Sequence, residues 1–326
     1  MTSGPLVIAV PSKGRLKEQV EEWLADCGLT LRVAGGARGY SAALVGFDDV
    51  QVRLASASDI ASQLHAGDIH LGVTGEDLLR ESANGGEARV MLLTPLGFGR
   101  ADLVVAAPKS WVDVETMADV DDVAHLYLAR TGQRLRVATK YLVQTRAFFA
   151  RHGIADYRLA ESGGATEGAP AMGAAELVVD ITTTGATLAA NGLKVISDGL
   201  MLKSQAHLAA ALGGGWSEAN QATCRRLLTI FEARARAKRV AGLTWPAAQE
   251  AVAQTAVSPF VDNGAPGRVH GALVERSRLF AAAAALAAAG VGPVSVEQPA
   301  YVFQPACAEA DRLAVALSGE AVQGSI

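Results

Sequence analysis

Short apolar runs and amphipathic segments alternate along the first two thirds of the chain. In the amphipathic segments apolar residues recur at helical spacing, as at Leu16, Val20 and Leu24, and similar segments cover 59–64, 116–128 and 144–152. The apolar runs have the length of buried strands and span Leu6–Val10, Val50–Ala55, Ile69–Val73, Leu103–Ala107, Arg134–Ala138 and Leu177–Ile181. Alternation of strands and helices is typical of parallel sheets covered by helices, so the pattern predicts an α/β protein.

The pattern changes after Ser217. Residues 218–240 predict one long helix with a basic end, and a smaller unit begins near Ala256. This unit contains the strand-like Arg268–Val274, the alanine-rich helical Leu279–Ala289, and the strand-like Gly292–Val296 and Ala300–Phe303. The sequence therefore predicts a small β-α-β-β domain on a helical linker, followed by a frayed tail over 316–326.

Composition narrows the class of protein. The chain has 326 residues, of which 50% are hydrophobic, so it can bury a sizeable core in two or three units. Lys and Arg number 29 against 33 Asp and Glu, a balance that predicts no general attraction to nucleic acid or acidic membranes. The three scattered cysteines favour reduced thiols in a cytoplasmic protein, and the six histidines show no metal-binding spacing. We expect neither a signal peptide nor a membrane-spanning helix.

A hydroxyl-rich turn follows the strand that ends near Asp180. Backbone N–H groups and threonine hydroxyls of the turn at 182–187 suit a phosphate monoester, and an aspartate at the strand end can accept hydrogen bonds from an adjacent sugar diol. The structural alternative is a threonine-capped helix after a buried strand. No GxxxxGK[ST] motif occurs, which excludes a Walker A loop.

Three further segments carry charged residues at predicted turns. Lys13 and Arg15 follow the first strand, where two cations at a helix start oppose the helix dipole unless they bind an anion. The alternative is a solvated basic turn. The segments 161–167 and 97–100 contribute Glu161, Glu167 and Arg100, and by themselves both are also explained as solvated loops.

Together these residues resemble one family closely, the ATP phosphoribosyltransferases (HisG), which catalyse the first step of histidine biosynthesis. The family signature is matched by Glu167, Gly173, Ala175, Val178, Asp180, Thr184, Gly185, Thr187 and Leu188. Other matching segments are Pro11–Leu16, Leu71–Leu78, Gly97–Arg100 and Arg136–Thr139, so the resemblance covers roughly 5–215. The chain departs from the pattern at Ser56, where many relatives carry Arg, and at Val143, where they carry Asn.

The resemblance implies two α/β lobes of the type II periplasmic-binding-protein kind. Lobe one should comprise 1–96 and 190–225, lobe two 97–189 with the phosphate turn, and 226–326 a helical linker and a small α+β (ACT-like) regulatory domain. In long-form relatives histidine binds such a domain and inhibits. The catalytic part looks more like short-form relatives, which work with a histidyl-tRNA-synthetase-like regulatory subunit. Both arrangements stay open, and a homo-oligomer is expected.

The resemblance also implies the reaction, which joins N1 of the ATP adenine to C1 of the ribose of phosphoribosyl pyrophosphate (PRPP) and needs Mg²⁺. Asp180 should bind the ribose hydroxyls, and Lys13, Arg15 and Arg100 the pyrophosphate and ATP phosphates. Gly14, Asp77, Glu161 and Glu167 are candidates for the ATP side, and for Glu161 and Glu167 binding of Mg²⁺ and positioning of the substrate are alternatives. The PRPP phosphate is assigned to Ile181, Thr182, Thr183, Thr184, Gly185, Ala186 and Thr187. Two other functions are alternatives: a non-catalytic bilobed small-molecule sensor, and a phosphoribosyltransferase with another acceptor.

Overall fold

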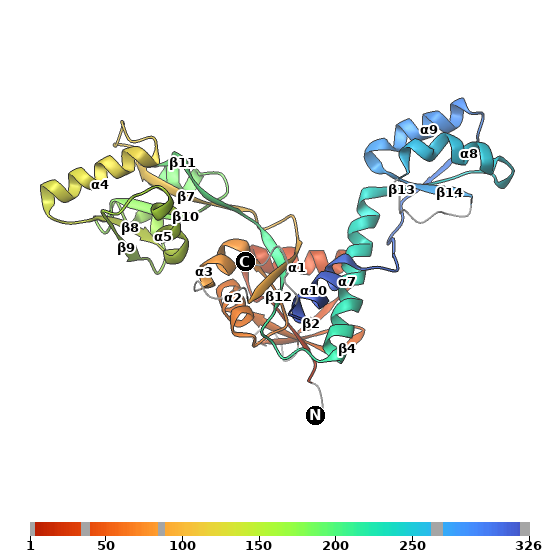
Figure 1. The fold of residues 1–326 in the computed structure, drawn as a ribbon, viewed down its shortest axis with the longest axis horizontal. Helices are drawn as coiled ribbons and strands as arrows, with labels where there is room; N and C mark the ends of the chain where they lie inside the picture. Colours follow the sequence, from red (N-terminus) through yellow and green to blue (C-terminus); the bar gives the residue numbers. More distant parts are fainter. Residues whose placement is uncertain (1–3, 34–39, 84–88, 262–269, 320–326) are drawn as a thin grey trace. The chain divides into compact units, whose positions relative to one another are not determined.

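A computed structural model describes residues 4–33, 40–83, 89–261 and 270–319 of the chain. The described chain divides into two compact units. The larger unit consists mainly of Pro5–Glu22 and Leu31–Trp216, and the smaller one mainly of Trp23–Thr30 and Ser217–Glu320. Figure 1 shows both units and labels many of their elements.

The first sheet of the larger unit holds seven strands within the described residues. In spatial order they are β2 (Leu31–Val33), β3 (Ser41–Leu44), β4 (Phe47–Ala55), β1 (Leu6–Pro11), β5 (Leu71–Gly75), β12 (Ala206–Ala211) and β6 (Val90–Pro95). The central pairs β1–β4 and β1–β5 are parallel, as the sequence pattern predicts. The helices α1 (Gly14–Asp26), α2 (Ala57–Ala66) and α3 (Glu76–Ser82) follow β1, β4 and β5 in the chain.

The second sheet has five strands in the described part of the chain. Their order is β11 (Leu193–Ser204), β7 (Ala101–Pro108), β10 (Leu177–Thr182), β8 (Leu135–Thr139) and β9 (Tyr157–Glu161). The pairs β10–β8 and β8–β9 are parallel, whereas β7 is antiparallel to both of its neighbours. Three helices accompany the sheet: α4 (Met117–Thr131), α5 (Leu142–Arg151) and the short α6 (Ala186–Ala190). The core of this sheet centres on fully buried Leu103, Leu135, Phe149 and Leu177.

Six strands that the structure describes in these two sheets were not predicted from the sequence pattern: β2, β3, β6, β9, β11 and β12. For β11 and β12 the physical reason is clear. In β11 the pairing register with β7 shifts between Val195 and Leu200, and this irregularity breaks the two-residue alternation that identifies a strand. β12 is a fully buried, alanine-rich run, which by composition favours a helix. β11 pairs with β7 in the second sheet, so its residues do not belong with lobe one, to which 190–225 were assigned.

The smaller unit begins with α7 (Glu218–Arg239), the predicted long helix. It is followed by β13 (Val240–Thr244), α8 (Glu250–Val257), β14 (Gly271–Glu275), α9 (Leu279–Ala288), β15 (Ser295–Glu297) and α10 (Ala308–Leu317). β14 and β15 flank β13 and are both antiparallel to it, so α9 connects two strands that a third separates. This is a split β-α-β arrangement, covered on one side by α8 and α9 through Leu243, Val257 and Leu286.

Several details of the prediction for this unit are wrong. β13 and α8 precede the predicted start of the domain. β14 begins at Gly271, because His270 lies in a turn with a φ of +57°. Residues 268 and 269 of the predicted strand lie outside the described part. The segment 300–303 is not a strand; the Val302 N–H instead donates to the Ala233 carbonyl oxygen of α7 (3.0 Å). α10 was not predicted, and its end at Leu317 overlaps the predicted frayed tail over 316–326 by two residues; 320–326 lie outside the described residues.

Candidate active site

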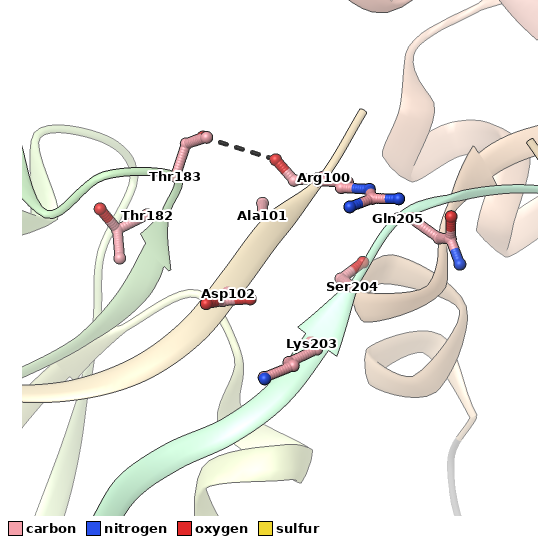
Figure 2. A pocket seen from close by; sticks show the side chains of 8 residues that line it. All are labelled: Arg100, Ala101, Asp102, Thr182, Thr183, Lys203, Ser204 and Gln205. Atoms are coloured by element: carbon pink, nitrogen blue, oxygen red, sulfur yellow. Dashed lines mark hydrogen bonds between the residues drawn. The ribbon is translucent and has the colours of Figure 1, made fainter. Parts of the chain in front are cut away.

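A cavity of about 400 Å³ opens where three strands of the second sheet begin or end. Its lining combines cations, hydroxyl groups, one carboxylate and one amide: Arg100, Ala101, Asp102, Thr182, Thr183, Lys203, Ser204 and Gln205. Figure 2 shows these side chains around the start of β7 and around the ends of β10 and β11. The structure thus brings Arg100 next to the start of the phosphate turn, although the two are 83 residues apart in sequence. The Thr183 hydroxyl donates a hydrogen bond to the Arg100 carbonyl oxygen (3.4 Å).

Strand pairing sets three of the lining residues in one row. Thr182 of β10 is opposite Asp102 of β7, and Asp102 is opposite Lys203 of β11. Residues directly opposite one another in neighbouring strands project from the same face of a sheet. Lys203, Asp102 and Thr182 therefore share one face, and β7 lies between the two outer residues.

The turn after β10 is shaped by its own threonines. The Gly185 N–H donates to Thr182 Oγ1 (2.8 Å), and the Ala186 N–H donates to Thr184 Oγ1 (3.4 Å). Gly185 has a φ of +75°, which an L-residue with a side chain rarely adopts, and it caps α6. Thr183, Thr184 and Thr187 are exposed, so hydroxyl groups surround an open turn.

Asp180 lies at the end of β10 and is partly buried. Burial raises the pKa of Asp180 and the charge of Glu167 acts in the same direction, against a hydrogen bond from the Ile181 N–H (2.8 Å) and the charge of Lys140. The carboxylate can accept further hydrogen bonds, as binding a sugar diol requires.

The basic turn lies at the other sheet. Lys13, Gly14 and Arg15 are exposed at the end of β1, and they do not line the cavity. The start of α1 nevertheless reaches the segment before Arg100: a Cβ atom on Gly99 would stand 3.1 Å from Leu16 Cδ1.

Asp77 is buried and its carboxylate is engaged inside the chain. It accepts from the Tyr141 hydroxyl (2.8 Å) and the Ser204 hydroxyl (2.6 Å). The neighbouring Glu81 accepts from the Val143 and Gln144 N–H groups at the start of α5 (2.8 and 3.2 Å). These contacts join α3 of the first sheet to α5 and β11 of the second.

The remaining predicted acids stand apart from the cavity lining. Glu161 is exposed at the end of β9, and Glu167 is partly exposed in a short 3₁₀ turn (Thr166–Gly168). Ser56, one departure from the family pattern, has a local role: its Oγ accepts from the Asp59 N–H (3.1 Å) and caps α2.

Sequence reasoning missed Asp102, Lys203, Ser204 and Gln205 of the lining. Asp102 follows the Gly97–Arg100 segment after one residue, Ala101, and could have been noticed there. Lys203 and its neighbours carry no local signal, because only the pairing of the unpredicted β11 with β7 brings them to the site.

Fold and cavity define the class of protein: a two-sheet α/β protein whose strand ends collect cations and hydroxyl groups suited to a phosphorylated ligand. The family model described as HisG: ATP phosphoribosyltransferase matches residues 56–232. The chain belongs to this family, and it is a transferase of histidine biosynthesis. The predicted family and enzyme class are thereby confirmed, and the transferase is favoured over the bilobed sensor and over a different acceptor.

Relatives match beyond the family model. An ATP phosphoribosyltransferase of Caulobacter vibrioides (strain NA1000 / CB15N) is 64% identical over 98% of this chain and 99% of its own length. A Nitrobacter winogradskyi relative of the same name is 50% identical over 91% of this chain and 94% of its own length. The chain is thus a long form with an additional C-terminal region.

A solved structure supports the fold class. The structure described as "ATP phosphoribosyl transferase (HisG:HisZ) complex from Thermotoga maritima" matches with a TM-score of 0.53 and 22% identity, over 70% of this chain and 96% of that chain. The predicted α/β fold class, with a small C-terminal sheet domain, is confirmed. No helix among the described residues has the length and apolar character needed to cross a membrane.

Proposed function

We propose that the cavity beside β7, β10 and β11 is where the chain joins N1 of the ATP adenine to C1 of PRPP. The N1 lone pair forms the new bond to C1, and the bond from C1 to the pyrophosphate oxygen breaks with its electron pair leaving on pyrophosphate. One observation carries the proposal: Arg100, Thr182 and Thr183, each selected from sequence, line a single cavity. Holding two substrates in register and stabilising the departing charge are the main tasks of such a site.

The residues singled out in the sequence have the following proposed roles. The turn from Ile181 to Thr187 would hold the 5-phosphate through its hydroxyl and N–H groups, and Asp180 would accept from the ribose hydroxyls. Lys13, Arg15 and Arg100 would neutralise pyrophosphate and the ATP phosphates, with Gly14 giving the turn its left-handed backbone (φ +75°). Glu161 and Glu167 are assigned to the ATP side, and Asp77 to positioning.

We also propose Mg²⁺ as the cofactor. The described residues contain no group of three or more His, Cys, Asp or Glu side chains that could hold a metal ion alone. Mg²⁺ in such enzymes is bound by one or two carboxylates together with substrate phosphates. Asp180 and Glu167 fit this use, because the charge of Glu167 adds to burial in raising the pKa of Asp180. The ion would supply positive charge to the departing pyrophosphate.

The C-terminal residues 226–326 are proposed to be regulatory, in a cytoplasmic homo-oligomer inhibited by histidine. The support is that this region has its own sheet and core, separate from the cavity lining. A histidyl-tRNA-synthetase-like subunit remains the other proposed route to regulation, supported by the HisG:HisZ complex named for the Thermotoga maritima structure.

The test is incubation of the purified chain with ATP, PRPP and Mg²⁺, alone and with such a subunit, with products identified by mass. We expect phosphoribosyl-ATP and pyrophosphate, lost on chelating Mg²⁺ and reduced by histidine. Arg100→Met should lower turnover, whereas Arg130→Met on the exposed end of α4 should not. Folded protein that yields no product under either condition would contradict the proposed function.

A further inference from the structure

Lys203 is a cation of the cavity lining to which the assignments above give no role. It stands at the opposite end of the cross-strand row from Thr182, with Asp102 between them. Neighbouring strands are about 4.8 Å apart, so the two outer residues are separated by about 10 Å across the sheet. A ligand that extends along this row from the phosphate turn meets a cation at its far end.

The Lys203 ammonium is available to such a ligand. A lysine opposite an aspartate in neighbouring strands would ordinarily be explained as a stabilising cross-strand ion pair. In the described parts of the chain, however, no carboxylate lies within 4 Å of the Lys203 Nζ, and none lies within 4 Å of the Arg100 guanidinium. The Lys203 side chain is exposed and lines the cavity, so its charge can interact with a bound ligand.

The backbone beside Lys203 is held on several sides. The buried Ser204 hydroxyl donates to Asp77, and the Glu76 N–H donates to the Gln205 carbonyl oxygen (3.1 Å). The Ala206 N–H donates to the Phe98 carbonyl oxygen (3.0 Å), which fixes this segment against the one that carries Arg100. The position of Lys203 relative to the cavity is therefore set before a ligand arrives, as a preorganised binding site requires.

We propose that Lys203 is a substrate-binding residue that contacts the pyrophosphate group of PRPP. This inference rests on the proposed function, in which the turn at 182–187 holds the 5-phosphate. PRPP carries negative charge at both ends, and Lys203 and the turn lie at the two ends of one row (Figure 2). Lys203 thus distinguishes PRPP from a sugar phosphate that lacks the pyrophosphate group.

The experiment titrates PRPP and ATP separately, in buffer with Mg²⁺, into the full chain and its variants by calorimetry. Lys203→Met should weaken PRPP binding about 10- to 100-fold, the loss expected for one charged hydrogen bond, and leave the ATP dissociation constant within about twofold. Lys203→Arg should recover most of the PRPP affinity. Lys194→Met is the matched control, because it removes the same charge from the same strand but does not line the cavity.

Ribose 5-phosphate separates the pyrophosphate contact from a contact with the 5-phosphate. Its affinity should be the same in Lys203→Met and in the unmodified chain; an equal loss for ribose 5-phosphate and PRPP would overturn the proposal. Unchanged PRPP binding in folded Lys203→Met, or a greater loss for ATP, would also overturn it. If the unmodified chain itself forms no phosphoribosyl-ATP, it is the proposed function that fails, whatever Lys203 does.

Discussion

Ser204 and Asp77 form a reciprocal pair of hydrogen bonds at the crossing between the two sheets. The Ser204 hydroxyl donates to the Asp77 carboxylate over 2.6 Å and accepts from the Asp77 N–H over 3.1 Å. Both residues are buried, and Tyr141 supplies a second hydroxyl donor to the same carboxylate. A buried carboxylate is stable only while such donors are present.

Ser204→Ala should therefore lower the free energy of unfolding by about 1–3 kcal/mol, because it leaves the buried Asp77 carboxylate with one donor fewer. Urea denaturation followed by circular dichroism measures the change. Ser197→Ala is the control on the same strand: its hydroxyl donates to the exposed Glu115 carbonyl oxygen (2.8 Å), which water can replace. If Ser197→Ala lowered the free energy of unfolding as much as Ser204→Ala, burial of the Asp77 carboxylate would not explain the effect at Ser204.

Asp180→Asn should weaken PRPP binding about 10- to 150-fold and ATP binding far less, since a charged acceptor for a sugar hydroxyl contributes about 1.5–3 kcal/mol. Separate titrations of the two substrates measure this. Equal losses of affinity for both substrates would indicate that Asp180 has a structural role instead.

The pH dependence of PRPP binding offers an independent check on Asp180. Burial raises the pKa of its carboxyl group above the ordinary value, so the ionised acceptor is lost at a higher pH than for an exposed aspartate. PRPP affinity should fall as the pH decreases through this raised pKa, and Asp180→Asn should remove that acidic limb. An unchanged acidic limb in the variant would assign it to another group.

Lys13→Ala and Arg15→Ala should lower turnover about tenfold or more without lowering the melting temperature, because both side chains are exposed and their proposed partner is a substrate anion. Lys17→Ala provides the comparison on the same helix: Lys17 pairs with Glu21 (3.0 Å), an exposed contact of small value. Unchanged turnover in both Lys13→Ala and Arg15→Ala would indicate that the turn has only a structural role.

Glu176→Gln should destabilise the fold by about 1–3 kcal/mol near neutral pH while leaving the substrate affinities intact. Burial alone would raise the pKa of Glu176, but hydrogen bonds from the Arg136 side chain and N–H outweigh it, so the pKa is lowered. A lowered pKa means that the stabilisation is present above the unfolded-state pKa and is lost as the pH falls through the folded-state value.

The loss of unfolding free energy in Glu176→Gln should therefore become smaller as the pH is lowered. Urea denaturation at a series of pH values measures this loss. Asp122→Asn, an exposed carboxylate on α4, should change stability by less than about 0.5 kcal/mol at every pH. A pH-independent deficit at Glu176 would contradict the ion-pair explanation.

The sequence by itself determined the elements whose pattern is local. β1, β5, β7 and β10 are short apolar runs, and the threonines and Gly185 after β10 predict a turn there. A buried strand between helices needs no distant information, because its hydrophobicity and its turn residues are sufficient. The family signature lies within these same local segments, so the family and its reaction were also available.

Only the tertiary structure decided which residues share the cavity. Lys203 joins Thr182 and Asp102 because β11 pairs with β7, and the irregular register of β11 hides this strand from any two-residue pattern. β12 was hidden for the opposite reason, since its alanines favour a helix until burial between β5 and β6 overrides that preference. Asp77 was predicted from the sequence as a candidate for the ATP side. Its burial and its hydrogen bonds with Ser204 and Tyr141 could not be predicted, because these residues are far from Asp77 in the sequence.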